Sequence, residues 1–252
     1  MNLTESVDWE KVTSSNFVYE KGCWNSACQS LCCRSSVAGA NFRIINERSV
    51  SLLYLPGEYE YHQKEKTLPV ASGEENKVRT WKLDFGRSAC LEVNWTQCWF
   101  EGRCVEPARK PLVCKLYPFL PILDLDGNLE ELCLLNIFDL TIEARDFEKR
   151  CNILDLQAKY TDQWRGDKEV LKTFQHPFFI FHFRAAKIIL DNYLDTLNQN
   201  EKLRGKQGEE FWSCWEIEYF TGRLLNLEAL RPEVANLYDL VIQKYGEMAL
   251  CS

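Results

Sequence analysis

The sequence lacks the short glycine-rich loops with which many enzymes hold a nucleotide or activate a serine. Only 12 of its 252 residues are glycine, and it contains no Gly-x-Gly-x-x-Gly run, phosphate loop or Gly-x-Ser-x-Gly elbow. Histidine is scarcer still, and its three copies, His62, His176 and His182, show no His-x3-His spacing. We therefore expect no standard nucleotide-binding loop, and histidines that cap helices or pack in the core rather than bind a metal.

Long apolar runs and targeting signals are missing too. No uninterrupted apolar stretch approaches the roughly 20 residues that cross a bilayer, so we expect no membrane partner. Residues 1–10 are acidic and polar, without the basic start and apolar centre of a secretion signal. These features predict a cytoplasmic protein whose cysteines are reduced.

Positive charge is in deficit. Lysine and arginine number 30 against 37 acidic residues, a net charge of −7, which disfavours a nucleic-acid partner because such a surface needs a basic face. One local basic stretch stands inside a group of cysteines and reads as a solvated loop or as counter-charge to thiolates: Arg103, Arg109, Lys110 and Lys115. The rest of the composition, 46% apolar and 27% charged, is that of an ordinary globular protein.

Cysteine, in contrast, is abundant and clustered. Seven of the 12 cysteines fall in two groups, the first with Cys23, Cys28, Cys32 and Cys33 and the second with Cys98, Cys104 and Cys114. Thiolates at such spacings let a short loop direct several sulfurs at one cation, and zinc and iron both suit soft ligands. A disulfide scaffold or buried thiols would be the alternatives, but a chain of this length can bury a core without covalent crosslinks. Metal binding is the leading interpretation.

The order of sequence patterns predicts an α+β fold. Residues 1–135 form an irregular, short-stranded cysteine-cluster part, and residues 136–252 a helical part, which together could make one compact domain. Short apolar runs bounded by turn residues predict strands at 42–45, 51–55, 79–85, 91–95 and 120–125. The turn signal Asp126-Gly127-Asn128 predicts a hairpin with a second strand at 129–135, and residues 63–77 read as an exposed loop.

Three helices are expected in the second part. One begins at Pro177, and another covers residues 209–225 with aromatic residues almost all round, as in a buried helix. A third runs from Arg231, with Pro232 in its first turn, to Gly246, because apolar residues recur there at helical spacing.

One stretch of the sequence resembles a known family. The run from Cys104 to Phe119 has a cysteine, nine residues, a second cysteine, a Lys-Pro pair three residues before it and Tyr-Pro-Phe shortly after it. This pattern is similar to the hallmark of the cysteine-cluster proteins described as a zinc- or iron-chelating domain, and Cys98 resembles a further family cysteine. The spacing of the first cluster departs from the commonest family spacing, with four and then three intervening residues instead of two, and resembles the variant of flagellin lysine methylases. The resemblance covers residues 23–125.

The residues add expectations of their own about this site. Lys110-Pro111 should stiffen the chain before Cys114, and Tyr117-Pro118-Phe119 should form an apolar plug over the site. Four thiolates saturate a structural zinc or a 4Fe-4S cluster, so seven cysteines leave some spare or serve two metals. The remaining cysteines stand among apolar residues and should be packed thiols: Cys90, Cys133, Cys151, Cys214 and Cys251.

Two functions follow. The first is a metal-binding protein that holds zinc or an iron–sulfur centre in a multi-cysteine site. The second, implied by the resemblance, is an S-adenosylmethionine-dependent lysine methylase that acts on a protein substrate with the help of the cluster domain. The sequence shows no independent motif for that cofactor.

Overall fold

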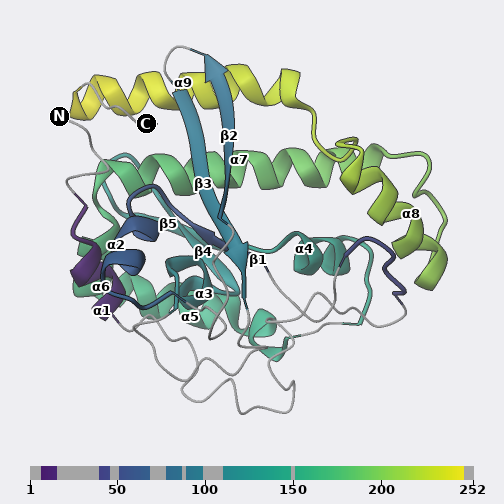
Figure 1. Cartoon of the computed structure of the whole chain (residues 1–252), viewed down its shortest axis with the longest axis horizontal. Helices are drawn as coiled ribbons and strands as arrows, with labels where there is room; N and C mark the ends of the chain where they lie inside the picture. The colour runs from purple at the N-terminus through teal and green to yellow at the C-terminus, as the bar shows by residue number, and fades with distance from the viewer. Residues whose placement is uncertain are drawn as a thin grey trace.

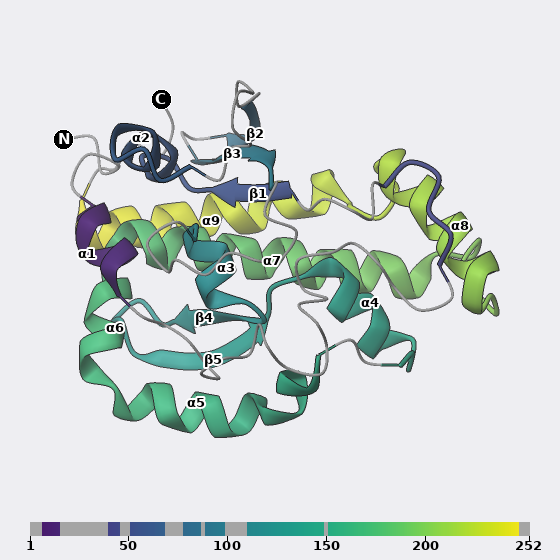
Figure 2. The same cartoon turned by 60° about the horizontal axis from the view of Figure 1, so that its bottom comes forward.

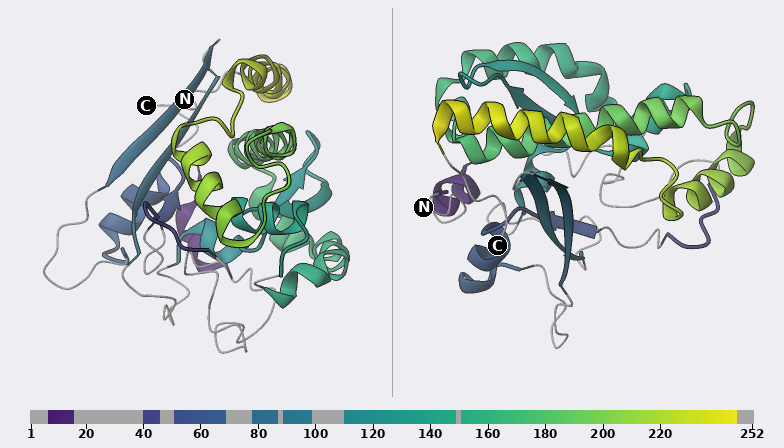
Figure 3. Two further views of the ribbon diagram at one scale, coloured as in Figure 1. Left: turned by 90° about the vertical axis from the view of Figure 1, so that its right-hand side faces the viewer. Right: turned by 90° about the horizontal axis from the view of Figure 1, so that it is seen from above.

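The computed structural model describes residues 7–15, 40–45, 51–68, 78–86, 89–98, 110–148 and 151–246. Within them the chain has the predicted α+β fold, and its strands all precede residue 135, whereas the longest helices follow it (Figure 1). Two sheets lie on opposite sides of a pair of antiparallel helices, and a further helix covers the outer face of the second sheet (Figures 2 and 3). In the part of the chain so described, no helix combines the length and apolarity that crossing a membrane requires.

The first sheet has three antiparallel strands in the order β1-β3-β2: β1 (Ser51–Tyr54), β3 (Ala89–Gln97) and β2 (Arg79–Gly86). Tyr54 is the register partner of Asn94, and both side chains are buried. Alternate side chains of a strand point to the same face of a sheet, so the face that carries Tyr54 and Asn94 is the one turned to the protein interior.

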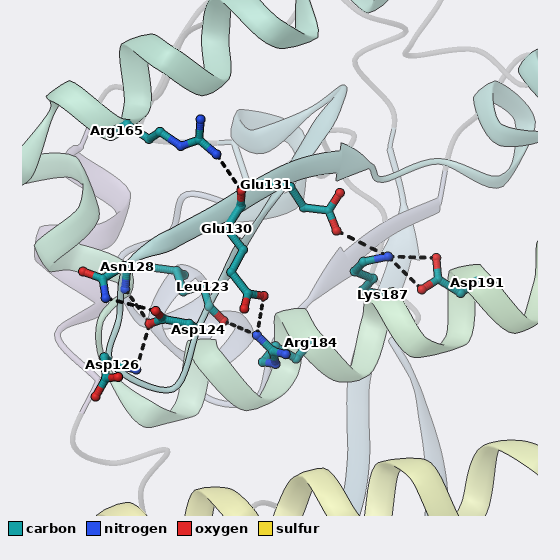
Figure 4. Close-up of polar contacts among 10 residues, drawn as sticks. All are labelled: Leu123, Asp124, Asp126, Asn128, Glu130, Glu131, Arg165, Arg184, Lys187 and Asp191. Carbon is teal, nitrogen blue, oxygen red and sulfur yellow. Dashed lines mark hydrogen bonds and ion pairs between the residues drawn. The ribbon is translucent and has the colours of Figure 1, made fainter.

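The second sheet is the predicted hairpin of β4 (Phe119–Leu123) and β5 (Leu129–Leu134). Its turn is held by the Asp124 carboxylate, which accepts hydrogen bonds of 2.8 Å from the backbone N–H groups of Asp126 and Asn128 (Figure 4). An aspartate that binds its own following backbone is what the Asp-Gly-Asn signal predicts. The turn is confirmed.

Two basic side chains of helix α7 (Pro177–Gln199) bind this hairpin. Arg184 Nη1 lies 2.7 Å from the Glu130 carboxylate and donates to the Leu123 carbonyl at 2.8 Å, and Lys187 Nζ lies 3.4 Å from Glu131 (Figure 4). The partly exposed pairs contribute little each, whereas the bond to the carbonyl fixes the hairpin's direction.

Two long helices form the middle layer. Helix α7 (Pro177–Gln199) packs on β4 and on α9 (Leu227–Tyr245), which in turn packs on β2 (Figure 3). The short helix α8 (Gly208–Phe220) connects them at one end of the molecule (Figure 1). The remaining helices are α1 (Trp9–Ser14), α2 (Glu58–Lys64), α3 (Leu112–Leu116), α4 (Ile137–Ala144), α5 (Gln157–Gly166), α6 (Lys168–Phe174) and a 3-10 turn at Asn152–Leu156.

The aromatic start of α7 organises the main core. Phe178 and Phe179 are buried, and the ring of Trp9 from α1 meets them edge-on at centroid distances of 6.0 and 5.7 Å. One cluster of buried residues includes members from both sides of the expected boundary at 135, such as Leu120 and Phe179. The division into two parts stays a prediction.

Residues 42–45 are not a strand, contrary to expectation. The backbone N–H groups of Arg43, Ile44 and Ile45 all donate to the buried carboxylate of Glu216 on α8, at 2.9, 2.8 and 2.8 Å. A bend that turns three successive N–H groups to one acceptor cannot also pair as a strand. The apolar pattern was right about burial of Phe42 against the core but wrong about backbone conformation.

The helix ends also differ from prediction. Helix α9 begins a turn early, at Leu227, because the Asn226 side chain caps it, and Pro232 lies inside the helix. Helix α8 ends at Phe220 and leaves Ile217, Tyr219 and Phe220 substantially exposed, so it is not buried all round. Helix α2 was not predicted, and its end falls in the expected loop at 63–77, of which residues 69–77 lie outside the described residues.

The histidines have the structural roles expected of them. The His176 side chain caps α7 by accepting a hydrogen bond from the Phe178 N–H at 3.2 Å, and His182 and His62 are buried. His182 lies 4.0 Å, centroid to centroid, from the ring of Phe178. Its Nδ1 forms a hydrogen bond with the Phe178 carbonyl, whereas its Nε2 has no hydrogen-bond partner in the part of the chain that the structure describes.

Glu216→Gln should destabilise the protein by about 1–3 kcal/mol, because the amide would present N–H groups to backbone donors in a buried site. Denaturant unfolding would measure this loss. Glu209→Gln is the matched control, because Glu209 on the same helix makes an exposed contact of 3.4 Å with Asn41, and the substitution should change stability by less than about 0.5 kcal/mol. Equal effects of the two substitutions would contradict the role assigned to Glu216.

His182→Leu should make the free energy of unfolding depend less on pH below pH 6.5. Burial lowers the pKa of His182 from 6.5 to about 4, so its contribution is fully present above pH 6.5 and is lost as pH falls towards 4, where the unfolded chain already binds the proton. Between pH 6.5 and pH 4, the free energy of unfolding of the parent should therefore fall by up to about 3 kcal/mol more than that of the variant. Unfolding free energies measured at a series of pH values would show parallel curves if His182 contributed nothing.

Candidate metal centre

The structure describes two of the seven predicted metal ligands, Cys98 and Cys114. The other five, Cys23, Cys28, Cys32, Cys33 and Cys104, lie outside the described residues. Nowhere in the described ranges do three or more His, Cys, Asp or Glu side chains form a group that could hold a metal ion. What the structure does establish is how the two described cysteines are placed.

Cys98 follows the last residue of β3. The side chains of Asn94 and Thr96 are buried on one face of this strand, opposite Tyr54 and Leu52 of β1. Continuing the alternation by two residues places Cys98 on that same inner face. Its side chain is partly exposed, at the rim of the buried row.

Cys114 belongs to the short helix α3, which lies between β1 and β4 (Figure 2). The extended backbone of Pro111 precedes this helix, with φ −60° and ψ 158°, so the expected stiff entry is present, although Cys114 itself is helical. It too is partly exposed.

The helix that carries Cys114 packs against β1, the strand that ends in Tyr54. Burial is the largest cause that raises the pKa of Tyr54 above its ordinary range, and negative charge on Cys114, Glu58 and Cys98 raises it further. On β3, Cys98 lies four residues beyond Asn94, the register partner of Tyr54. Among the described residues, the hydroxyl of Tyr54 has no hydrogen-bond partner.

Glu58 positions the helix that carries Cys114. Its carboxylate is fully buried and accepts hydrogen bonds from the backbone N–H of Leu112, the first residue of α3, at 2.5 Å, and from that of Leu55 at 3.0 Å. Burial raises the pKa of Glu58 to about 7, while these N–H groups and the Lys115 charge oppose the rise. The first N–H groups of a helix have no acceptor within the helix, and the Glu58 carboxylate supplies one for the N–H of Leu112.

Two further titratable side chains are buried beside Glu58. Lys115 donates to the carbonyls of Thr13 and Ser15 at the end of α1, and burial lowers its pKa to about 8. His62 Nδ1 lies 2.7 Å from the Thr67 hydroxyl, and its Nε2 lies 3.9 Å from Glu58 without a hydrogen bond. Burial, and then the charge of Lys115, lowers the pKa of His62 to about 4. Lys115 is thus buried and no part of a solvated loop.

The Tyr117-Pro118-Phe119 segment joins α3 to the hairpin. Its Tyr117–Pro118 bond is cis, and the Tyr117 hydroxyl donates to the buried Asp139 carboxylate of α4 at 2.6 Å. Phe119 is fully buried, with its ring 6.4 Å from that of Tyr160. These contacts fix α3 against the core, and the expected role as a plug over a metal stays a prediction.

Among the remaining cysteines, the prediction of a reduced thiol was wrong for Cys90. We expected a packed thiol, but Cys90 is disulfide-bonded, and the single sequence gives no means of telling which cysteines meet in the fold. Cys133, Cys151 and Cys214 carry thiols in buried or partly buried positions, as expected, and burial raises the pKa of Cys133 to about 12. Cys251 lies outside the described residues.

Sequence reasoning missed Tyr54 and Glu58. The pair Pro56-Gly57 marks the turn before α2, and this signal could have placed a helix start at Glu58. Nothing local indicates that its carboxylate reaches Leu112, 54 residues further along the chain.

Comparisons with protein-family models, with curated proteins and with solved structures gave no match. The resemblance to the cysteine-cluster proteins accordingly rests on the residues quoted for it.

Glu58→Ala should lower the free energy of unfolding by about 2–3 kcal/mol, because it leaves the N–H groups of Leu55 and Leu112 buried without an acceptor. It should also loosen α3 and speed the labelling of Cys114 by a thiol reagent. Glu60→Ala on the exposed side of the same helix is the control and should stay within about 0.5 kcal/mol of the parent. An unchanged stability in Glu58→Ala would remove Glu58 from the support of α3.

Proposed function

We propose that this protein binds zinc or an iron–sulfur cluster of the 4Fe-4S type through cysteine thiolates, with Cys98 and Cys114 among the ligands. The observation that supports the proposal is that α3, which carries Cys114, packs against β1, the strand that pairs with β3, and Cys98 follows the end of β3. Metal sites commonly join segments distant in sequence in this way, because each segment then contributes one or two ligands to a site that only the fold completes.

The chemistry of these side chains suits such a group. Thiolates bind zinc and iron strongly, and a partly exposed rim position leaves a sulfur accessible to a metal. A bound zinc would stabilise the fold, and an iron–sulfur cluster would carry electrons. We expect Cys23, Cys28, Cys32, Cys33 and Cys104 to supply the other ligands, as the resemblance implies.

The support for Cys114 is stronger than its place in a motif alone. Glu58 and the hairpin hold α3 from both ends, so the direction of the Cys114 side chain is set by the core and not by a loose loop. A preorganised ligand binds with less loss of conformational entropy.

The methylase hypothesis rests on the resemblance alone. It requires S-adenosylmethionine and a protein substrate, and no specific contact among the described residues favours it over metal binding. We therefore propose metal binding as the function.

Cys114→Ser and Cys98→Ser should each lower the metal content sharply, because a hydroxyl is a poor ligand for these metals. The protein would be purified anaerobically, and its metal per chain and its absorption would be measured. Cys214→Ser is the matched control, since this partly buried thiol lies on α8, at the far end of the molecule from α2 (Figure 1). Equal loss in all three variants, or in none, would overturn the assignment of Cys98 and Cys114.

A further inference from the structure

Strand β2 forms an open edge of the first sheet. It pairs with β3 on one side, and among the described residues no strand pairs with its other side. The opposite edge of the sheet is β1, which is shorter and against which α3 packs, whereas most residues of β2 are exposed. Half of the backbone N–H and C=O groups of an edge strand point away from its neighbour, so they can pair with a further strand.

The side chains of β2 do not cover this edge. The Thr80 hydroxyl donates to Asn94 at 2.8 Å and Lys82 Nζ lies 3.9 Å from the Glu92 carboxylate, so both side chains contact their register partners on β3. Helix α9 packs on the later half of the strand. Trp81 is 45% exposed, although tryptophan is among the side chains that folded proteins bury most fully on average. An exposed aromatic residue on a long edge strand indicates a contact surface.

The charges of β2 select the strand that can pair with it. An edge lysine such as Lys82 deters most strands, because its ammonium group would then lie against their side chains without a counter-charge. Asp84 stands two residues further along on the same face of the strand and is exposed. Its Oδ1 accepts a hydrogen bond of 2.8 Å from the Gly86 N–H, and a carboxylate can accept further bonds. A second copy of β2 brings the negative charge that Lys82 needs.

We propose that two copies of this protein associate through their β2 strands, which pair antiparallel across a two-fold axis at Leu83. Opposed side chains of an antiparallel pair point to the same face, so an axis of this kind places one residue opposite itself. An axis at Leu83 puts Lys82 of each copy opposite Asp84 of the other, which makes two cross-strand charge pairs. An axis at Lys82 would put two ammonium groups opposite each other, and like charges in that position destabilise a sheet.

This register also gives Trp81 a neighbour, because Phe85 of the second copy lies opposite it. The two three-stranded sheets then form one continuous sheet, and the edge is closed by symmetry. The register of β2 on β3 shifts after Asp84, so the regular part of the new ladder is short. We therefore expect a dimer that dissociates on dilution.

Charge reversal and its repair test the register. Lys82→Asp should raise the dissociation constant of the dimer by about tenfold, because both cross-strand pairs change from attraction to repulsion. The double variant Lys82→Asp with Asp84→Lys exchanges the two charges and should restore association. Lys168→Asp on α6 is the matched control, since it changes the net charge equally at an exposed residue and should leave association unchanged. Sedimentation velocity over a range of protein concentrations measures the dissociation constants.

Amide hydrogen exchange of the parent protein is a second measurement that needs no variant. Residues 79–85 should exchange more slowly in concentrated than in dilute solution, because pairing protects the outward N–H groups of β2. The exchange of β1 should not depend on concentration and is the internal control. Since Lys82→Asp also places a second carboxylate beside Glu92, thermal unfolding of the dilute variants checks that each one folds. If a variant fails to fold, the exchange measurement decides.

The outcomes are distinct. Concentration-dependent protection of β2, with association lost in the single variant and regained in the double variant, supports the inference. A parent that is monomeric at every concentration, with β2 exchange unchanged, overturns it, whether or not a different chain pairs with this edge. A dimer that Lys82→Asp does not weaken, or that the double variant does not restore, overturns it as well, because the copies then meet elsewhere or in another register.

Discussion

The burial of helix α7 between the two sheets is the constraint on which the other elements depend. Its first turns bring Phe178, Phe179 and Phe183 into the core, and its later turns carry the buried Tyr193. A helix buried on most sides must be covered on most sides, and α9, the hairpin, α1 and α4 supply that cover. The site near Tyr54 inherits its rigidity from this arrangement, because α3 lies between the hairpin on α7 and the first sheet.

Buried carboxylates fix the backbone of segments that connect the packed elements. Glu58 accepts hydrogen bonds from two backbone N–H groups in separate segments. Glu216 accepts hydrogen bonds from three backbone N–H groups of a single bend. Hydrogen bonds to a charged acceptor are stronger than neutral ones and fix direction as well as distance. The exposed ion pairs of the hairpin, such as Lys187 with Glu131, are screened by water and add less.

The sequence predicted those parts of the fold that local patterns determine. Alternating and apolar runs placed β1 to β4, Asp126-Gly127-Asn128 placed the hairpin turn, and Pro177 placed the start of α7. It failed at residues 42–45, where the backbone conformation depends on a carboxylate more than 170 positions away, and at Pro232, which lies inside a helix capped earlier by Asn226. For the site, spacing singled out Cys98 and Cys114, but Glu58 supports the helix of Cys114 only because α2 and α3 meet in space, and Tyr54 lies on the strand against which α3 packs.

The bond between the 43–45 bend and Glu216 also constrains the order in which the chain can assemble. Its partners are 173 residues apart at the longest, so it closes one of the largest loops in the molecule. Closing a long loop carries an entropy cost that must be met before the contact stabilises anything, and such contacts form after local helices and hairpins. During synthesis the bend leaves the ribosome before α8 does, so its three N–H groups have no Glu216 acceptor until residues 171 to 173 positions further along have been made. The docking of this early segment therefore has to wait for the synthesis of α8, and truncation of α8 before Glu216 would leave it without its acceptor.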